Sequence, residues 1–383
     1  MRGSITRRGK TSWRLRFDVA PTTPGRRERR YVTVRGSRQD AERELARLVG
    51  AIYDNTLIEP SRVTVEDQLQ GWFSGHHGLG GKTVERYEQL AKYQILPYLS
   101  AIPLQKLRPA HITEWHGKLL KTAGANGRPL STRTISHAHH VLQRALEHAV
   151  AGEILTRNVA SIVRPPRVET KEAQALSAEQ IETVLAALAG HEFEPLVILA
   201  LASGARRGEL LALRWSDTSL SAGTIRIERS LEQTAGGLKF KRPKTRTGIR
   251  TISLSTAAVE ALQAHRRKQL EQRLALGLGK AGPDALVFTN LEGNPIRPDS
   301  LSRRWGDLVR SLKLPPVSFH ALRHSHASAL ILAKIDPLTV SRRLGHSRPS
   351  VTLDIYSHLV ANTDSEAADV MQQILKGGGS PRR

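Results

Sequence analysis

Hydrophobic positions recur with two different periods along this chain, and the changes of period divide it into three regions. Near the start, Trp13, Leu15 and Phe17 alternate with arginine, which is the two-residue period of a half-buried strand. A second strand begins at Arg29, after the turn signature PTTPG. This first region is therefore predicted to contain a small, strongly basic β-sheet.

From Ser37 the apolar positions change to the helical period, and Leu45, Leu48 and Ile52 fall on one helix face. Serine is a preferred residue at the N-terminus of a helix, so Ser37 is the expected N-cap. Sheet and helix together predict a domain over residues 1–60, with a three-stranded sheet backed by one helix. Its many arginines would allow the strands to enter a DNA groove, although a solvated charged face is the alternative.

Residues 61–167 follow the helical period over most of their length and predict an all-helical domain. The expected helices cover residues 83–96, ended by Pro97, then 108–121 and 131–152. The last of these helices carries four histidines, His137, His139, His140 and His148. Because no acidic or cysteine partner stands at ligand spacing, we interpret them as polar-face residues and not as a metal site.

A charged, proline-containing segment starting at Arg164, RPPRVETKEAQ, predicts a linker. After it, Ser177 and Gln180 have the spacing of a capping box that starts a helix. The region 168–383 mixes helices with a short strand cluster between residues 224 and 254 and ends in a flexible GGGSPRR tail. The expected fold class is therefore α+β and multidomain, and the third domain is mainly helical with a small antiparallel sheet.

Composition narrows the functional classes. The formal net charge is +23, with a sequence pI near 10.9, which favours a polyanionic partner such as nucleic acid. The chain has no cysteine, which excludes disulfides, thiolate nucleophiles and cysteine-ligated zinc. Neither a secretory leader nor an apolar stretch long enough to span a bilayer is visible, so we expect no membrane partner.

The third region holds an ordered series of polar residues. In ALASGARRGELLALRW, a cation follows a Ser-Gly break between two apolar helical stretches, where unpaired backbone N–H groups favour anions. Downstream come a lysine near a hairpin, the segment FHALRHSHAS, the triplet LGH and the sequence DIYSHL. The candidate residues in these segments are Arg206, Lys244, His320, Arg323, His346 and Tyr356.

Taken together, these segments resemble the catalytic domain of the tyrosine recombinase (phage integrase) family. That family has an arginine after a Thr/Ser-Gly step, a hairpin lysine, His-x-x-Arg, Leu-Gly-His and a tyrosine about ten residues on. Every position is filled here in the same order, and Ser203 stands where many relatives have threonine. The region 61–167 is similar to the family's core DNA-binding domain, and residues 1–60 are similar to its arm-site-binding domain.

The resemblance implies a catalytic role for each candidate. Tyr356 would attack the scissile phosphate and form a 3′-phosphotyrosyl bond, while Arg206 and Arg323 would bind the non-bridging oxygens. His346 would also donate to the phosphate, His320 would act as the base, and Lys244 as the general acid, with Lys239 and Lys241 as nearby alternatives. Glu209 resembles the family's buried acidic partner. No metal or cofactor is implied.

The family's partners are double-stranded DNA attachment sites, a homotetramer and, in some cases, DNA-bending and directionality proteins. The resemblance implies that a helix after Tyr356, with Val370, Ile374 and Leu375 on one face, packs on a neighbouring protomer. We expect the protein in the cytoplasm of a prokaryotic host, at the nucleoid. The alternatives are a catalytically silent DNA-binding protein of the same fold, a type IB topoisomerase and a chromosome-dimer resolvase.

Overall fold

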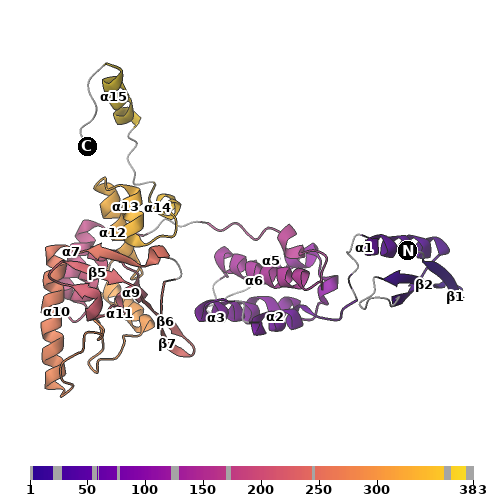
Figure 1. Ribbon diagram of the computed structural model, residues 1–383, viewed down its shortest axis with the longest axis horizontal. Coiled ribbons are helices and arrows are strands. Elements are labelled where there is room, and N and C mark those ends of the chain that lie inside the picture. The colour runs from indigo at the N-terminus through magenta and orange to yellow at the C-terminus, as the bar shows by residue number, and fades with distance from the viewer. Residues whose placement is uncertain are drawn as a thin grey trace. The chain divides into compact units, whose positions relative to one another are not determined.

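The structure is a computed structural model that describes residues 3–19, 28–53, 58, 60–75, 78–121, 129–169, 174–243, 246–357 and 364–376. The chain separates into two compact units, Met1–Glu169 and Thr170–Arg383 (Figure 1). The finer division into domains at residues 1–60, 61–167 and 168–383 stays a prediction.

A three-stranded antiparallel sheet begins the first unit. Its strands lie in the order β1 (Ser4–Gly9), β2 (Ser12–Val19) and β3 (Glu28–Arg35), followed by helix α1 (Arg38–Tyr53). Leu15 and Phe17 are buried against α1. Because side chains alternate along a strand, Arg14 and Arg16 lie on the other face, with Tyr31 directly opposite Arg16. The predicted sheet backed by one helix is confirmed.

Reciprocal hydrogen bonds cap the start of α1. The Ser37 hydroxyl accepts from the Asp40 amide at 3.2 Å, and the Ser37 amide donates to the Asp40 carboxylate at 2.9 Å. The indole of Trp13 donates to the Gly36 carbonyl at 3.1 Å and joins the sheet to the helix start. Ser37 is therefore the N-cap that its residue type predicted.

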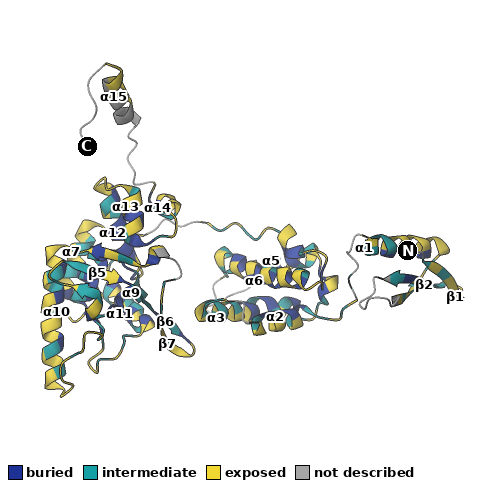
Figure 2. Ribbon diagram, in the orientation of Figure 1, coloured by how far each residue is buried: buried dark blue, intermediate teal, exposed yellow. Residues whose placement is uncertain are grey.

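The rest of the first unit is helical, as predicted. Its elements are α2 (Val65–Ser74), α3 (Gly81–Leu90), a π-helical segment (Ala91–Ile95), α4 (Leu96–Leu99), the 3₁₀ turns Leu104–Lys106 and Val159–Ile162, α5 (Pro109–Lys121) and α6 (Thr132–Ala151). Helix α6 contacts α2, α3 and α5, so its buried face forms the centre of this core. Trp115, Ile135 and Leu142 are completely or almost completely buried there. Figure 2 shows buried positions among exposed ones along these helices.

Two sequence interpretations of this region are wrong. Pro97 does not end the helix that precedes it, because the chain continues as α4 to Leu99. The π-helical segment inserts a wider turn just before Pro97, and the proline then falls at the start of α4, where its missing N–H is tolerated. His139 is not on a polar face: it is 2% exposed and lies 3.2 Å from His116, nitrogen to nitrogen.

The second unit is mainly helical and carries two small antiparallel sheets among the described residues. Strands β4 (Thr218–Ser219), β5 (Thr224–Ile227) and β8 (Arg250–Ser253) form one sheet, and β6 (Ser230–Thr234) and β7 (Gly237–Lys241) form a hairpin. The helices are α7 (Ala178–Leu188), α8 (Glu194–Ser203), α9 (Arg207–Leu210), α10 (Thr256–Ala275), α11 (Pro298–Ser311), α12 (Ala321–Leu332), α13 (Pro337–Leu344), α14 (Pro349–Tyr356) and α15 (Asp364–Leu375). The predicted mixture of helices with a short strand cluster is confirmed.

Helix α8 lies at the centre of this unit. It contacts α7, α9, α10 and α12, and its sequence EPLVILALAS is apolar on nearly every side after the first two residues. A helix that is apolar all round is stable in water only when other elements cover it. These contacts fix the position of the C-terminal end of α8 and of the residues that follow it. No described helix is long and apolar enough to cross a membrane.

Replacing Leu142 by alanine tests the helical core of the first unit. Leu142 is fully buried, so Leu142→Ala leaves a cavity and is expected to lower the free energy of unfolding by about 2–5 kcal/mol. The matched control is Leu120→Ala on α5, which is 44% exposed and should change stability by no more than about 0.5 kcal/mol. Urea unfolding followed by tryptophan fluorescence measures both. Equal losses would contradict this core.

Candidate active site

A tight turn joins α8 to α9 and carries the first candidate residue. Helix α8 ends at Gly204, whose φ of 63° is in the left-handed region that glycine tolerates. The Ser203 hydroxyl donates to Leu199 O at 2.6 Å and accepts from the Ala205 amide at 3.2 Å. A Cβ at Gly204 would lie 2.5 Å from the ring of His326, so the turn also requires glycine for space. These constraints direct Arg206 out of the turn.

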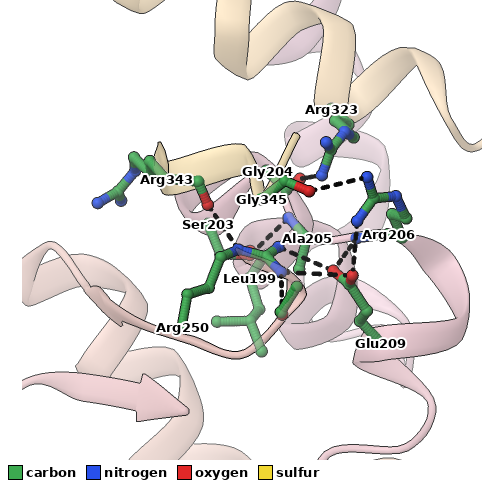
Figure 3. A network of polar contacts seen from close by, with 11 residues as sticks. Leu199, Ser203, Gly204, Ala205, Arg206, Glu209, Arg250, Arg323, Arg343 and Gly345 are labelled. Carbon is green, nitrogen blue, oxygen red and sulfur yellow. Dashed lines mark hydrogen bonds and ion pairs between the residues drawn. The ribbon is translucent and has the colours of Figure 1, made fainter. Parts of the chain in front are cut away.

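The carboxylate of Glu209 binds two arginines. Arg206 Nη1 lies 2.9 Å from Oε1, and the Arg206 amide donates to Oε2 at 2.9 Å. Arg250, in β8, donates to the same two oxygens at 3.3 and 2.8 Å (Figure 3). The side chains of Glu209 and Arg250 are 4% and 7% exposed, whereas that of Arg206 is 42% exposed. The buried acidic residue that the resemblance implied therefore holds the accessible arginine.

Burial alone would raise the pKa of the Glu209 carboxyl. Hydrogen bonds and charge from Arg250, and then from Arg206, outweigh burial and hold that pKa below its ordinary value. The Glu209 carboxylate also accepts a hydrogen bond from the Arg206 backbone amide at the start of α9. The expectation that free amides at this helix junction would bind an anion is therefore wrong for the Arg206 amide, which has a carboxylate partner already.

Arg323 reaches the same turn from α12. Its Nη1 donates to Gly204 O at 2.8 Å, and the residue is 3% exposed. Arg206 Nη2 donates to Gly345 O at 3.2 Å (Figure 3), and the charge of Arg206 acts on Arg323. Arg323 Nη2 is buried and has no hydrogen-bond partner among the described residues. Burial, and then the charge of Arg206, lower the pKa of Arg323.

Two neighbouring cations with a spare buried donor form a site for an anion. An unpaired buried donor is unfavourable by about 1–3 kcal/mol, and like charges repel each other. An oxyanion in contact with both guanidinium groups would remove both penalties, and the planar fork of arginine suits phosphate oxygens. The geometry therefore supports phosphate binding by Arg206 and Arg323.

His346 stands beside this pair, directly after Gly345. Its Nδ1 lies 2.8 Å from the hydroxyl of Thr352. Burial, followed by the charges of Arg323, Arg206 and Arg250, lowers the pKa of His346 to about 4, so the ring is neutral at physiological pH. If Nδ1 accepts from the Thr352 hydroxyl, the ring hydrogen is on Nε2, which can then donate to an oxyanion.

Tyr356 ends α14 and is 3% exposed. Burial raises the pKa of its phenol to about 12, and the charge of Arg323 opposes that rise. Its hydroxyl lies 2.7 Å from Nδ1 of His324, a residue that the sequence analysis did not select. His320, which was expected to be the base, precedes α12 as its N-cap, and its ring centroid is 4.9 Å from that of His324.

Lys244 lies outside the described residues, so its expected role stays a prediction. The β6–β7 hairpin ends at Lys241, three positions earlier in the sequence. Lys241 is paired with Glu232 across that hairpin, whereas Lys239 is exposed. Among the described residues, no group of three or more His, Cys, Asp or Glu could hold a metal ion.

Sequence reasoning missed two residues of this cluster. His324 follows Arg323 directly in LRHSHAS, so its adjacency to a candidate arginine was an available signal. Arg250 had no comparable signal, because it is one of many arginines and stands 41 positions from Glu209. Only strand β8 brings it to the carboxylate, where it also donates to Arg343 O at 2.7 Å.

Comparison with known proteins gives two family matches. Residues 174–363 match the model described as "Phage integrase family", and residues 64–120 match "Phage integrase, N-terminal SAM-like domain". An integrase of Streptomyces ambofaciens is 29% identical over 366 residues, covering 91% of this chain and 90% of the relative. A tyrosine recombinase XerC-like protein of Caldanaerobacter subterraneus subsp. tengcongensis is 27% identical over 359 residues, covering 88% and 90%.

Solved structures show the same fold. The Tn1549 transposon integrase, in complex with transposon right end DNA, has a TM-score of 0.68 at 22% identity and covers 81% of this chain and 99% of its own. A lambda integrase dimer bound to a COC′ core site has a TM-score of 0.58 at 17% identity, covering 92% and 93%.

Replacing Glu209 by glutamine tests the carboxylate that joins the arginines. Glu209→Gln leaves Arg250 buried without its counter-charge, and is expected to lower the free energy of unfolding by about 3–5 kcal/mol at pH 7. Since the folded pKa of Glu209 is depressed, its stabilisation is present above the ordinary value of about 4.3 and is lost as pH falls through the folded pKa.

The matched control is Glu192→Gln, which removes an exposed ion pair with Arg304 and should change stability by about 0–1 kcal/mol. Denaturant unfolding of wild type and both variants between pH 7 and pH 3 measures these effects. A Glu209→Gln protein as stable as wild type at pH 7, or a difference that grows on acidification, would rule out the assigned ion pairs.

Proposed function

The chain belongs to the phage integrase family of tyrosine-type site-specific DNA recombinases, and we propose that it cuts and rejoins DNA through a covalent bond to Tyr356. The observation that carries this proposal is the pair Arg206 and Arg323 near Gly204, with one buried guanidinium nitrogen that has no partner in the described part of the chain. An oxyanion would offset the two positive charges, and the charge of Arg323 also lowers the pKa of Tyr356 against the effect of burial.

The proposed reaction is a transfer of the phosphodiester from DNA to protein and back. The Tyr356 oxygen attacks the scissile phosphorus, the bond to the 5′ oxygen breaks, and a 3′-phosphotyrosyl ester with a free 5′-hydroxyl results. Arg206 and Arg323 stabilise the charge that develops on the non-bridging oxygens, and the neutral ring of His346 donates to them. Lys244 protonates the leaving oxygen. His320 takes part in removing the tyrosine proton.

We propose double-stranded attachment-site DNA as the partner. The net charge of +23 suits a polyanion, and binding should weaken as salt increases. We assign arm-type sites to the basic face of the N-terminal sheet, where Arg14 lies over the ring of Tyr31 with its Cζ 5.8 Å from the ring centroid. Tyr31 is 58% exposed, so this face offers both cations and an aromatic ring to DNA.

We propose that the protein acts as a homotetramer on two DNA duplexes, with DNA-bending and directionality proteins as accessory factors. Met371, Ile374 and Leu375 of α15 are exposed by 53%, 51% and 81%. These apolar side chains suit packing on a neighbouring protomer. Val370 was expected on the same face, but its side chain is not among those that the structure describes. A cytoplasmic, nucleoid-associated location in a prokaryotic host stays a prediction.

Three other functions make different predictions. A catalytically silent DNA-binding protein would form no covalent complex. A type IB topoisomerase would relax supercoils without site preference. A chromosome-dimer resolvase would act on a chromosomal site, and its relatives usually lack the extra N-terminal domain. The basic N-terminal sheet and the Leu-Gly-His triplet favour a recombinase over a topoisomerase, and the extra N-terminal domain favours an integrase over a resolvase.

Replacing Tyr356 by phenylalanine tests the nucleophile. A nicked suicide duplex carrying the candidate attachment site, found next to the gene, should trap wild type as a covalent adduct on a denaturing gel. Tyr356→Phe should give no adduct, because it lacks the attacking oxygen, yet should bind the same DNA with unchanged affinity in a gel shift. Tyr93→Phe, an exposed tyrosine in the first unit, is the matched control and should retain the adduct. An adduct that survives in Tyr356→Phe would exclude this nucleophile.

A double substitution of Arg14 and Arg16 by glutamine tests the N-terminal sheet. If each arginine contacts one phosphate, the slope of log affinity against log salt for arm-site DNA should fall by about 2. Arg38 and Arg47 lie exposed on α1, on the other side of the sheet, and their double replacement by glutamine should leave that slope unchanged. Equal effects of the two double variants would contradict binding by this face.

A further inference from the structure

The Tyr356 hydroxyl forms a hydrogen bond with a histidine for which the sequence predicted no catalytic role. His324 Nδ1 lies 2.7 Å from the Tyr356 oxygen, and the two ring centroids are 5.9 Å apart. The tyrosine ring packs in a small apolar cluster with Ala327, Val340 and Leu344. Packing of this kind restricts the ring, so the hydroxyl is presented to Nδ1 in a defined direction.

The ring of His324 also lies against that of His320, the histidine that the sequence suggested as the base. The rings of His320 and His324 are perpendicular, with centroids 4.9 Å apart. Among the described residues, a hydrogen bond joins the Tyr356 hydroxyl to Nδ1 of His324, and none joins it to His320. His320 can therefore act on the tyrosine through His324, or on the phosphate.

We propose that His324 is a catalytic residue that takes the proton of Tyr356 during DNA cleavage and returns it during religation. This inference rests on the proposed recombinase function. As the Tyr356 oxygen forms its bond to phosphorus, the O–H bond breaks and the proton moves to the lone pair on Nδ1. The electron pair of the broken P–O bond goes to the 5′ oxygen, which takes a proton from the general acid. Religation reverses each transfer.

The surroundings of His324 keep a lone pair available for this step. Burial, and then the charge of Arg323, lower the pKa of His324, so the ring is neutral at physiological pH. The titratable groups that face His324 are His320 and Arg323, both from the start of α12, and Tyr356 from α14. For Nδ1 to accept, the ring hydrogen must be on Nε2. Because the phenol is buried and weakly acidic, attack without a base would be slow.

The experiment measures single-turnover adduct formation on the nicked suicide duplex described above. His324→Asn keeps a polar group near the position of Nδ1 but cannot accept a proton at neutral pH, and is expected to slow adduct formation by about 10²- to 10⁴-fold. Affinity for the duplex and the melting temperature should stay close to those of wild type. His191→Asn, an exposed histidine between α7 and α8, is the matched control and should react at the wild-type rate.

Two further readouts separate a base from a purely structural residue. The wild-type rate should stay level from pH 8 down to below about 6.5, the ordinary pKa of histidine, whereas the rate of His324→Asn should keep rising with pH as hydroxide replaces the base. His324→Ala opens space beside Tyr356, and added imidazole should restore part of its rate.

Each result decides the question. The proposal would be overturned if His324→Asn formed the adduct at the wild-type rate, or if His324→Ala formed it faster. Either result would mean that the hydrogen bond only holds the Tyr356 hydroxyl in place and does not remove its proton. A slow His324→Asn without the change in pH profile, together with no imidazole rescue, would also overturn it. These outcomes leave the recombinase function standing. An absence of adduct from wild type would overturn the recombinase function itself.

Discussion

Glu209 is buried between two arginines, and its negative charge keeps a crowded set of cations in one place. The carboxylate binds the side chain and the backbone amide of Arg206, and it binds Arg250 from β8. Arg250 in turn donates to Arg343 O, and Arg206 donates to Gly345 O. One carboxylate therefore ties the α8–α9 turn to β8 and to the Leu-Gly-His segment. A buried carboxylate is tolerated only with such partners, so the connections depend on each other.

The charges around this carboxylate do not cancel. Glu209 offsets one unit of charge, whereas Arg206, Arg250 and Arg323 supply three, and one nitrogen of Arg323 has no hydrogen-bond partner among the residues that the structure describes. Burial, and then the charges of Arg323, Arg206 and Arg250, lower the pKa of His346 and keep its ring neutral. Neutral rings can accept a proton or donate a hydrogen bond, so the same environment suits both the phosphate binding and the proton transfer that we propose.

Local patterns predicted most elements correctly, because periodicity and capping depend on nearby residues. The reciprocal caps at Ser37 and Ser177 and the limits of α6 follow their sequence signatures. The errors arose where a distant partner or an unusual turn decided the outcome. His139 is buried where α5 packs on α6, and His116 from α5 lies at hydrogen-bonding distance from its ring. The helix through Pro97 continues because a π-helical segment precedes the proline.

The sequence by itself determined the chemistry available: its basic charge, the absence of cysteine, and an ordered series of arginine, histidine and tyrosine whose spacing resembles one family. It also indicated Glu209, through its position three residues after Arg206. Only the tertiary structure decided which of these side chains meet. Arg250 reaches Glu209 across 41 positions, and His324 reaches Tyr356 across 32. Such contacts are set by how helices and strands pack, and packing distances are not encoded in any local period.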